Sequence, residues 1–167
     1  MIVIMMGISG AGKSTIGRAL AAEHGWDFVE GDDLHPEANV DKMTRGEPLN
    51  DADRAPWLER LRQLILDRLA SNTDTVISCS ALKRVYRQRL RVDPVRVRFV
   101  YLHGDEALIR RRLAKRRGHF MPVDLLESQR QTLEPPADAI AADAAWSIAE
   151  SVRYITRQLD SPQRPPG

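Results

Sequence analysis

Residues 7–15 read GISGAGKST and directly follow an apolar run at residues 2–6. Gly7 and, after four intervening residues, Gly12, Lys13 and Ser14 match the pattern G-x-x-x-x-G-K-[ST] without a mismatch. Glycines let successive backbone N–H groups turn toward a phosphate, the lysine reaches the β and γ oxygens, and the serine hydroxyl helps to hold Mg²⁺. The motif therefore predicts a P-loop, a site for the phosphates of a nucleotide.

The segments on either side of the loop have the character that a P-loop requires. Residues 2–6 are apolar throughout, as expected for a buried parallel strand. After the loop, Ile16, Leu20 and Ala21 keep a helical spacing as far as Gly25, which can end a helix. A helix that begins near Ser14 also directs the positive end of its dipole at the phosphate.

The rest of the chain alternates between predicted strands and helices. We expect further strands at residues 26–30, 75–79, 97–102 and 139–143, and helices at residues 52–69, 82–90, 105–116 and 148–159. Asp51 is a plausible N-cap for the second helix of the chain. This alternation predicts an α/β three-layer fold, with a five-stranded parallel sheet and helices on both faces. Ligands of such sheets bind at the carboxyl ends of the strands.

Length and composition indicate one ordinary globular domain. The 167 residues fit a single domain, which we place at residues 1–160, followed by a disordered tail at residues 161–167. The net charge of +2 gives no argument for a nucleic-acid partner. The single cysteine, Cys79, cannot form an internal disulfide and is expected to be a small buried residue. With no apolar run of membrane-spanning length and no signal peptide, we expect a cytoplasmic protein without a membrane partner.

Polar residues follow the predicted strands at the edge where ligands bind. GDDLHP follows the second strand, Ser80 and Lys83 follow the third, and His103 follows the fourth. A carboxylate beside an attacking hydroxyl can take its proton during phosphoryl transfer, and Asp32 is placed for this role. An aspartate in a Gly-Asp-Asp loop is equally often a turn residue or a helix cap.

A basic cluster at residues 110–117 has two possible uses. Arg112 and Arg116 are four residues apart on one face of a predicted helix, which leads into RGHFMP. Small phosphoryl transferases close a mobile segment over the phosphate and supply arginine to its developing charge, so we expect a lid at about residues 115–125. The other basic residues of the cluster fit a solvated surface equally well.

The segment GDDLHPEANVDKMTRGEPLNDADRAPWL (residues 31–58) closely resembles the signature of the small P-loop gluconokinases. SCSALKRVYRQRLR, YLHGD, RRLAKRRGHFMPVDLLESQRQTLEPP and the P-loop match the same family in the same order, over roughly residues 2–158. The resemblance implies a fold similar to shikimate kinase and the nucleoside monophosphate kinases, with a substrate-binding insertion and a lid. It also implies transfer of the γ-phosphate of ATP to the 6-hydroxyl of D-gluconate, with Mg²⁺ as cofactor.

The resemblance assigns roles to individual residues. Lys13, Asp32 and Arg116 would be catalytic, with Asp32 as the base and Arg116 reaching the γ-phosphate from the lid. Ser14 and, through water, Glu30 would hold Mg²⁺, although this family position often carries aspartate. ATP would be bound by Gly7, Ser9, Gly10, Ala11, Gly12, Lys13, Ser14, Thr15, Arg112 and Arg116. The third predicted strand ends in Ser-Cys-Ser and lacks the aspartate of a Walker B motif.

The predicted acceptor, gluconate, carries one carboxylate and several hydroxyls, so its pocket needs a cation and polar side chains. Arg54 and Lys83 are the candidate cations, and the choice between them is open. The candidates for hydroxyl contacts are His35, Asn39, Ser80 and His119. His35 fits packing against Pro36 as an alternative, and Lys83 fits an exposed helix.

Two other functions are compatible with the motifs. One is a kinase for another small hydroxy-acid, such as shikimate or a different aldonate; the other is an ATP-dependent switch protein. The loops are rich in charged and hydroxylated residues, and aromatic residues make up only 5% of the chain. This composition favours a small polar acceptor over a nucleotide base. It leaves open whether the protein forms a homodimer.

Overall fold

Five strands form one parallel sheet in the order β2-β3-β1-β4-β5. The computed structural model describes residues 1–116 and 123–161. The strands are β1 (Ile2–Met6), β2 (Asp27–Glu30), β3 (Thr75–Ser78), β4 (Val97–His103) and β5 (Ile140–Asp143). Every residue of β1 is buried because this strand lies at the centre of the sheet, with helices on both faces. The predicted five-stranded parallel sheet is confirmed.

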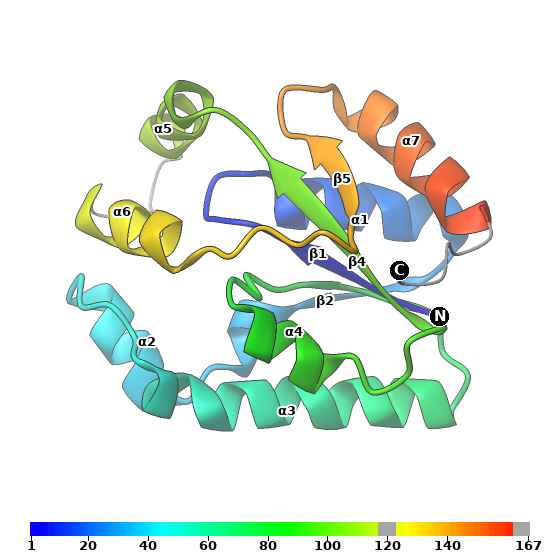
Figure 1. The fold of residues 1–167 in the computed structure, drawn as a ribbon, viewed down its shortest axis with the longest axis horizontal. Helices are drawn as coiled ribbons and strands as arrows, with labels where there is room; N and C mark the ends of the chain where they lie inside the picture. The colour runs from blue at the N-terminus through cyan, green and yellow to red at the C-terminus, as the bar shows by residue number, and fades with distance from the viewer. Residues whose placement is uncertain (117–122, 162–167) are drawn as a thin grey trace.

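Helices cover both faces of the sheet (Figure 1). Ile2, Ile4 and Met6 of β1 pack into the same core as α3 (Asp51–Ala70) and α4 (Arg84–Leu90). Val3 and Met5 point the other way, into a core shared with α1 (Lys13–His24) and α7 (Ile148–Asp160). The alternation of side chains along β1 therefore produces the two cores of a three-layer fold. No helix within the described part of the chain is long and apolar enough to cross a bilayer.

The N-cap of α3 lies one residue before the predicted one. Asn50 is the N-cap, and its side-chain oxygen accepts a hydrogen bond of 2.8 Å from the N–H of Asp53. The Asp53 carboxylate in turn accepts the N–H of Asn50 at 2.9 Å, which completes a capping box. The prediction that Asp51 is the cap is wrong, because Asn50 has the extended backbone of a cap and Asp51 is already helical.

Three short helices were not predicted, and they lie at the carboxyl ends of the strands. They are the 3₁₀-helix η1 (Gly31–Leu34), α2 (Glu37–Thr44) and α6 (Val123–Thr132). Figure 1 shows α2, α6 and α5 (Glu106–Lys115) at the same end of the molecule, on the left of the view. Residues 117–122, the middle of the predicted lid, and residues 162–167, most of the predicted tail, lie outside the described residues.

Candidate active site

The P-loop joins β1 to α1 and places an ammonium group over its own backbone. Gly12 precedes α1 with φ of 100°, a left-handed conformation that glycine adopts without strain. Lys13 is the first helical residue, and its Nζ donates a hydrogen bond of 3.0 Å to the carbonyl of Ile8. Burial lowers the pKa of Lys13, while the nearby carboxylate of Asp32 acts to raise it. The loop therefore holds a cation where the motif predicts the phosphates.

Asp32 lies on η1, directly after β2. A side chain at the preceding residue, Gly31, would place its Cβ 2.1 Å from the carbonyl oxygen of Ser78, so only glycine lets η1 start this close to β3. The Asp32 side chain is 67% exposed and lines a cavity together with Lys13 and other side chains. Burial raises the pKa of Asp32, and the charge of Lys13 opposes that rise.

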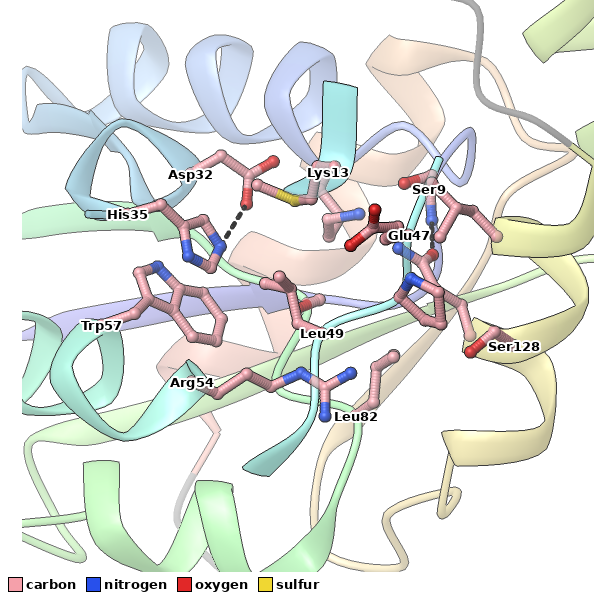
Figure 2. A pocket seen from close by; sticks show the side chains of 15 residues that line it. Ser9, Lys13, Asp32, His35, Glu47, Leu49, Arg54, Trp57, Leu82 and Ser128 are labelled. Carbon is pink, nitrogen blue, oxygen red and sulfur yellow. Dashed lines mark hydrogen bonds and ion pairs between the residues drawn. The ribbon is translucent and has the colours of Figure 1, made fainter. Parts of the chain in front are cut away.

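A cavity of about 200 Å³ lies beside the P-loop. Of the predicted site residues, it brings together Ser9, Lys13, Asp32, His35, Arg54 and Ser80. Figure 2 shows Asp32, His35 and Arg54 reaching it from the side of η1 and α3, and Ser9 and Lys13 from the P-loop. These side chains come from distant parts of the sequence. Their meeting in one cavity makes it the candidate active site.

The two candidate cations for an acceptor carboxylate lie differently. Arg54 lines the cavity, is 16% exposed, and donates through Nη1 to the Tyr86 hydroxyl at 3.0 Å. Lys83 is not among the described residues that line this cavity, and its Nζ is 2.8 Å from Oδ1 of Asp51. The hydrogen bond from Lys83 lowers the pKa of Asp51, with a smaller contribution from Tyr86. The Lys83 charge is thus already paired on the outside of the site.

Two arginines of the basic cluster, Arg112 and Arg116, were predicted to bind ATP. Arg112 donates to the carbonyl of Ala11 in the loop at 3.4 Å and to that of Ala144 beyond β5. Arg116 follows α5 as its exposed C-cap residue. Burial is the largest cause of the lowered pKa of Lys13, and the charge of Arg116 adds to the same effect. Arg112 therefore contacts the P-loop directly, and Arg116 is near enough for its charge to act on Lys13.

The predicted metal residues contribute oxygen atoms near the P-loop. Glu30 lies opposite Ser78 in the sheet register, accepts a hydrogen bond from its hydroxyl, and is 3.8 Å from Arg18. Among residues 1–116 and 123–161 there is no cluster of three or more His, Cys, Asp or Glu side chains suited to a metal ion. Mg²⁺ keeps several of its waters and binds substrate phosphates, so it needs few protein ligands. The hydroxyl of Ser14, in the first turn of α1, and the carboxylate of Glu30 are oxygen donors of the kind that would suit it.

Cys79 directly follows β3 and packs in the hydrophobic core. Its side chain is 1% exposed. Burial raises the pKa of the thiol to about 12, with a further contribution from the Asp32 charge. The thiol is therefore not ionised at neutral pH, and the prediction of a small buried residue is confirmed.

Two walls of the cavity were missed by sequence reasoning. Leu125, Ser128 and Gln129 of α6 form one, and the segment from Met43 to Leu49 contributes to the other. The side-chain oxygen of Gln129 accepts a hydrogen bond of 2.8 Å from the N–H of Ser9 in the P-loop. The available signal for this helix was the apolar pair Leu125 and Leu126, four and three residues before Gln129. His119, predicted to contact the acceptor, lies outside the described residues.

Comparison with known proteins gives consistent matches over most of the chain. A family profile described as "AAA domain" matches residues 2–136. The thermosensitive gluconokinase of Escherichia coli K12 is 49% identical, covering 87% of this chain and 80% of the relative. The gluconokinase of Gluconobacter oxydans is 48% identical, covering 81% of this chain and 76% of the relative.

A solved structure gives the same relationship. The crystal structure of a gluconokinase from Sinorhizobium meliloti superposes with a TM-score of 0.83 at 47% sequence identity, covering 94% of this chain and 90% of that one. The chain carries an AAA domain and belongs to the family of small P-loop gluconokinases.

Proposed function

We propose that this protein is a gluconokinase, which transfers the γ-phosphate of ATP to the 6-hydroxyl of D-gluconate and releases 6-phospho-D-gluconate and ADP. The observation that carries this proposal is the cavity in which Asp32 and Arg54 face the P-loop lysine, Lys13. One end of that cavity suits a nucleotide phosphate, and the other suits a small anion with hydroxyl groups. The names of the relatives agree with this chemistry.

In the proposed reaction, Asp32 accepts the proton of the 6-hydroxyl as its oxygen forms a bond to the γ-phosphorus. The bond from that phosphorus to the oxygen bridging the β- and γ-phosphates breaks, which leaves ADP. A base with a raised pKa suits this step, because its proton affinity lies closer to neutral pH. Lys13 and Arg116 offset the charge on the transferred group, which carries most of the negative charge in the transition state.

ATP would lie along the P-loop, with its phosphates on the backbone from Gly7 to Thr15. Arg112 would stack near the adenine, and its hydrogen bond to the loop carbonyl of Ala11 supports this role. Ser14 would bind Mg²⁺ directly, and Glu30 would hold its waters. When bound there, the ion would neutralise charge on the β and γ oxygens.

Arg54 is the better candidate for the gluconate carboxylate. It lines the cavity, and its contacts with the Tyr86 hydroxyl at 3.0 Å and with Oδ1 of Asp51 at 3.6 Å both use Nη1. The N–H groups on Nε and Nη2 of the planar fork would serve a carboxylate. Lys83 does not line the cavity, and its Nζ makes the shorter contact with Asp51, 2.8 Å against 3.6 Å for Nη1 of Arg54. Arg54→Ala should raise the KM for gluconate by about ten- to a hundredfold, because it removes a charge-assisted hydrogen bond. Lys83→Ala is the matched control, and a larger rise in that variant would transfer the role to Lys83.

A coupled assay of ADP release tests the proposed function as a whole. The purified protein would be offered ATP with D-gluconate, other aldonates, shikimate, or no acceptor. We expect the highest kcat/KM with gluconate and almost no ADP without an acceptor. Faster turnover of shikimate would indicate a kinase for another hydroxy-acid, and acceptor-independent hydrolysis would indicate a switch protein.

A further inference from the structure

The imidazole of His35 is held by two buried partners and turns one ring nitrogen toward the cavity. Its side chain is 5% exposed and stacks on the ring of Trp57, with centroids 4.4 Å apart and planes at 11°. Its Nδ1 lies 3.1 Å from Nδ2 of Asn39, a residue that is 4% exposed. Its Nε2 points toward the cavity, 4.0 Å from Oδ1 of Asp32, as the dashed line in Figure 2 shows.

The hydrogen bonds of Asn39 determine which ring nitrogen of His35 carries the proton. Asn39 Nδ2 also donates to the backbone carbonyl of Asp53 at 2.8 Å. A carbonyl oxygen can only accept, so the atom that faces it must be the NH₂ group of the amide. The second hydrogen of that group points at His35 Nδ1, which must therefore be an unprotonated acceptor. The proton of the neutral ring is then on Nε2, facing the cavity.

The charged form of the ring is disfavoured by the same surroundings. Burial and, secondarily, the charge of Arg54 lower the pKa of His35 to about 4. An imidazolium would also direct an N–H at the NH₂ group of Asn39, where no acceptor is available. At neutral pH, His35 thus presents one N–H donor to the cavity.

The distance of 4.0 Å between Nε2 of His35 and Oδ1 of Asp32 is too long for a direct hydrogen bond. An N–H···O hydrogen bond is about 2.7–3.2 Å long. The Nε2–H group is therefore available to a ligand oxygen that lies next to the Asp32 carboxylate. Asp32 can only accept when ionised, whereas His35 can only donate. The pair suits two neighbouring hydroxyl groups, one of which donates while the other accepts.

We propose that His35 is a specificity-determining residue, a neutral donor that binds the hydroxyl oxygen adjacent to the one that Asp32 deprotonates. This inference rests on the proposed function, under which the two oxygens are those on carbons 5 and 6 of gluconate. Asn39 is then a positioning residue, because it fixes the tautomer without reaching the substrate. His35 holds the polyol chain in line, so that the 6-hydroxyl meets Asp32.

The protonation of the ring can be measured without any substrate. Long-range ¹H–¹⁵N spectra of the full-length protein at pH 7, with His35→Phe to assign the signals, report the tautomer of each of the four histidines. We expect His35 to show the pattern of a neutral ring protonated at Nε2. A ring protonated at Nδ1, or an imidazolium, would overturn the proposal. This readout stands even if gluconate does not react, an outcome that would count against the proposed function alone.

Two substitutions separate the donor from the packing of the ring. His35→Phe keeps an aromatic ring for Trp57 and removes the donor, whereas His35→Gln keeps an N–H donor of similar reach. Steady-state kinetics should show a rise of about five- to tenfold in the gluconate KM for His35→Phe, the loss expected for one neutral hydrogen bond. The ATP KM should change little, and His35→Gln should recover most of the loss. Equal impairment of the two variants would indicate that the ring serves only packing.

An altered substrate identifies the oxygen that His35 binds. 5-Deoxy-D-gluconate lacks the hydroxyl next to the reacting one. The wild-type protein should prefer gluconate to this analogue by kcat/KM, and His35→Phe should reduce that preference by about five- to tenfold. A preference that is the same in both proteins would overturn the assignment of the neighbouring hydroxyl to His35.

Discussion

At the scale of single residues, burial acts on Lys13 and Asp32 in opposite directions. It lowers the pKa of the ammonium and raises the pKa of the carboxylate, while their mutual attraction opposes both shifts. The cavity therefore holds a cation and an anion that partly neutralise one another before substrates bind. A phosphate that binds Lys13 would remove part of this compensation and further favour a proton on Asp32. Nucleotide binding and proton acceptance are thus linked through one pair of charges.

Replacement of Asp32 tests its role as the base. Asp32→Asn keeps the shape of the side chain and removes its proton affinity, so kcat should fall by about 10²–10⁴-fold, with little change in the KM for ATP. Asp33 is the matched control, because it is the exposed neighbour on the same 3₁₀-helix. Asp33→Asn should be far milder in steady-state assays, and equal losses in the two variants would contradict the role given to Asp32.

Replacement of Lys13 tests the P-loop. Lys13→Ala removes the ammonium group and its hydrogen bond to the Ile8 carbonyl, but it leaves the glycine-rich backbone of the loop in place. Turnover should fall by at least about 10²–10³-fold, because the developing charge on the phosphate loses its fixed cation. Circular dichroism should show an unchanged fold. A variant with near wild-type kcat would mean that the loop does not hold the reacting phosphate.

The pKa of His35 makes stability depend on pH. It is about 4 in the folded protein and ordinarily 6.5, so between these values the unfolded chain binds a proton that the native state does not. The contribution of His35 to the free energy of unfolding is therefore nearly constant above pH 6.5. As the pH falls from 6.5 toward 4, protonation of the unfolded chain lowers that free energy. Urea unfolding should show roughly 2 kcal/mol of this loss between pH 7 and 4.5. His35→Phe should lack that part of the pH dependence; an identical dependence in both proteins would contradict the lowered pKa.

At the scale of elements, the strands could be predicted from sequence and the helices around the cavity could not. Every residue of β1 and β3 is buried, and β4 is mostly apolar apart from Arg98 and His103. Such apolar stretches are visible without knowledge of their neighbours. The helices α2 and α6 are short, and polar residues of α6 such as Gln129 face the cavity and the P-loop. A helix that is polar on its functional side has a weakened apolar pattern.

The site was predictable to the extent that a motif encodes it. Lys13 was identified from the P-loop motif, and Asp32 from its position directly after the second predicted strand and from the family signature. The role of Gln129 depends on a contact with Ser9, 120 residues away in sequence, which no local pattern reveals. The start of α3 was missed for another reason: Asn50 and Asp51 are both good capping residues, and only the backbone conformation separates them.

The cap of α3 provides a prediction with a matched control elsewhere in the fold. Asn50 begins the helix that carries Arg54, and Ser147 forms the same kind of capping box at the start of α7. Asn50→Ala and Ser147→Ala should each lower the free energy of unfolding by about 1 kcal/mol. Only Asn50→Ala should also raise the KM for gluconate, since it loosens the first turn that positions Arg54. A similar rise in both variants would show that the effect is one of general stability.

At the scale of the whole molecule, the strand order makes room for the acceptor. The P-loop follows β1 and Asp32 follows β2, but β3 lies between these two strands. Neighbouring strands are about 4.8 Å apart, so the two chain segments leave the sheet with a separation of about 10 Å. A hydroxyl and a phosphoryl group fit between them, above the end of β3. The separation that phosphoryl transfer requires is thus a consequence of the topology.

The position of the phosphate in the product tests the central claim most directly. The protein would be incubated with ATP, Mg²⁺ and D-gluconate labelled with ¹³C at carbon 6, and the product observed by ¹³C and ³¹P NMR. We predict that the carbon 6 signal becomes split by coupling to phosphorus, in step with the formation of one ADP per product. Consumption of ATP with phosphate on another carbon, or with inorganic phosphate as the only product, would contradict the proposed function.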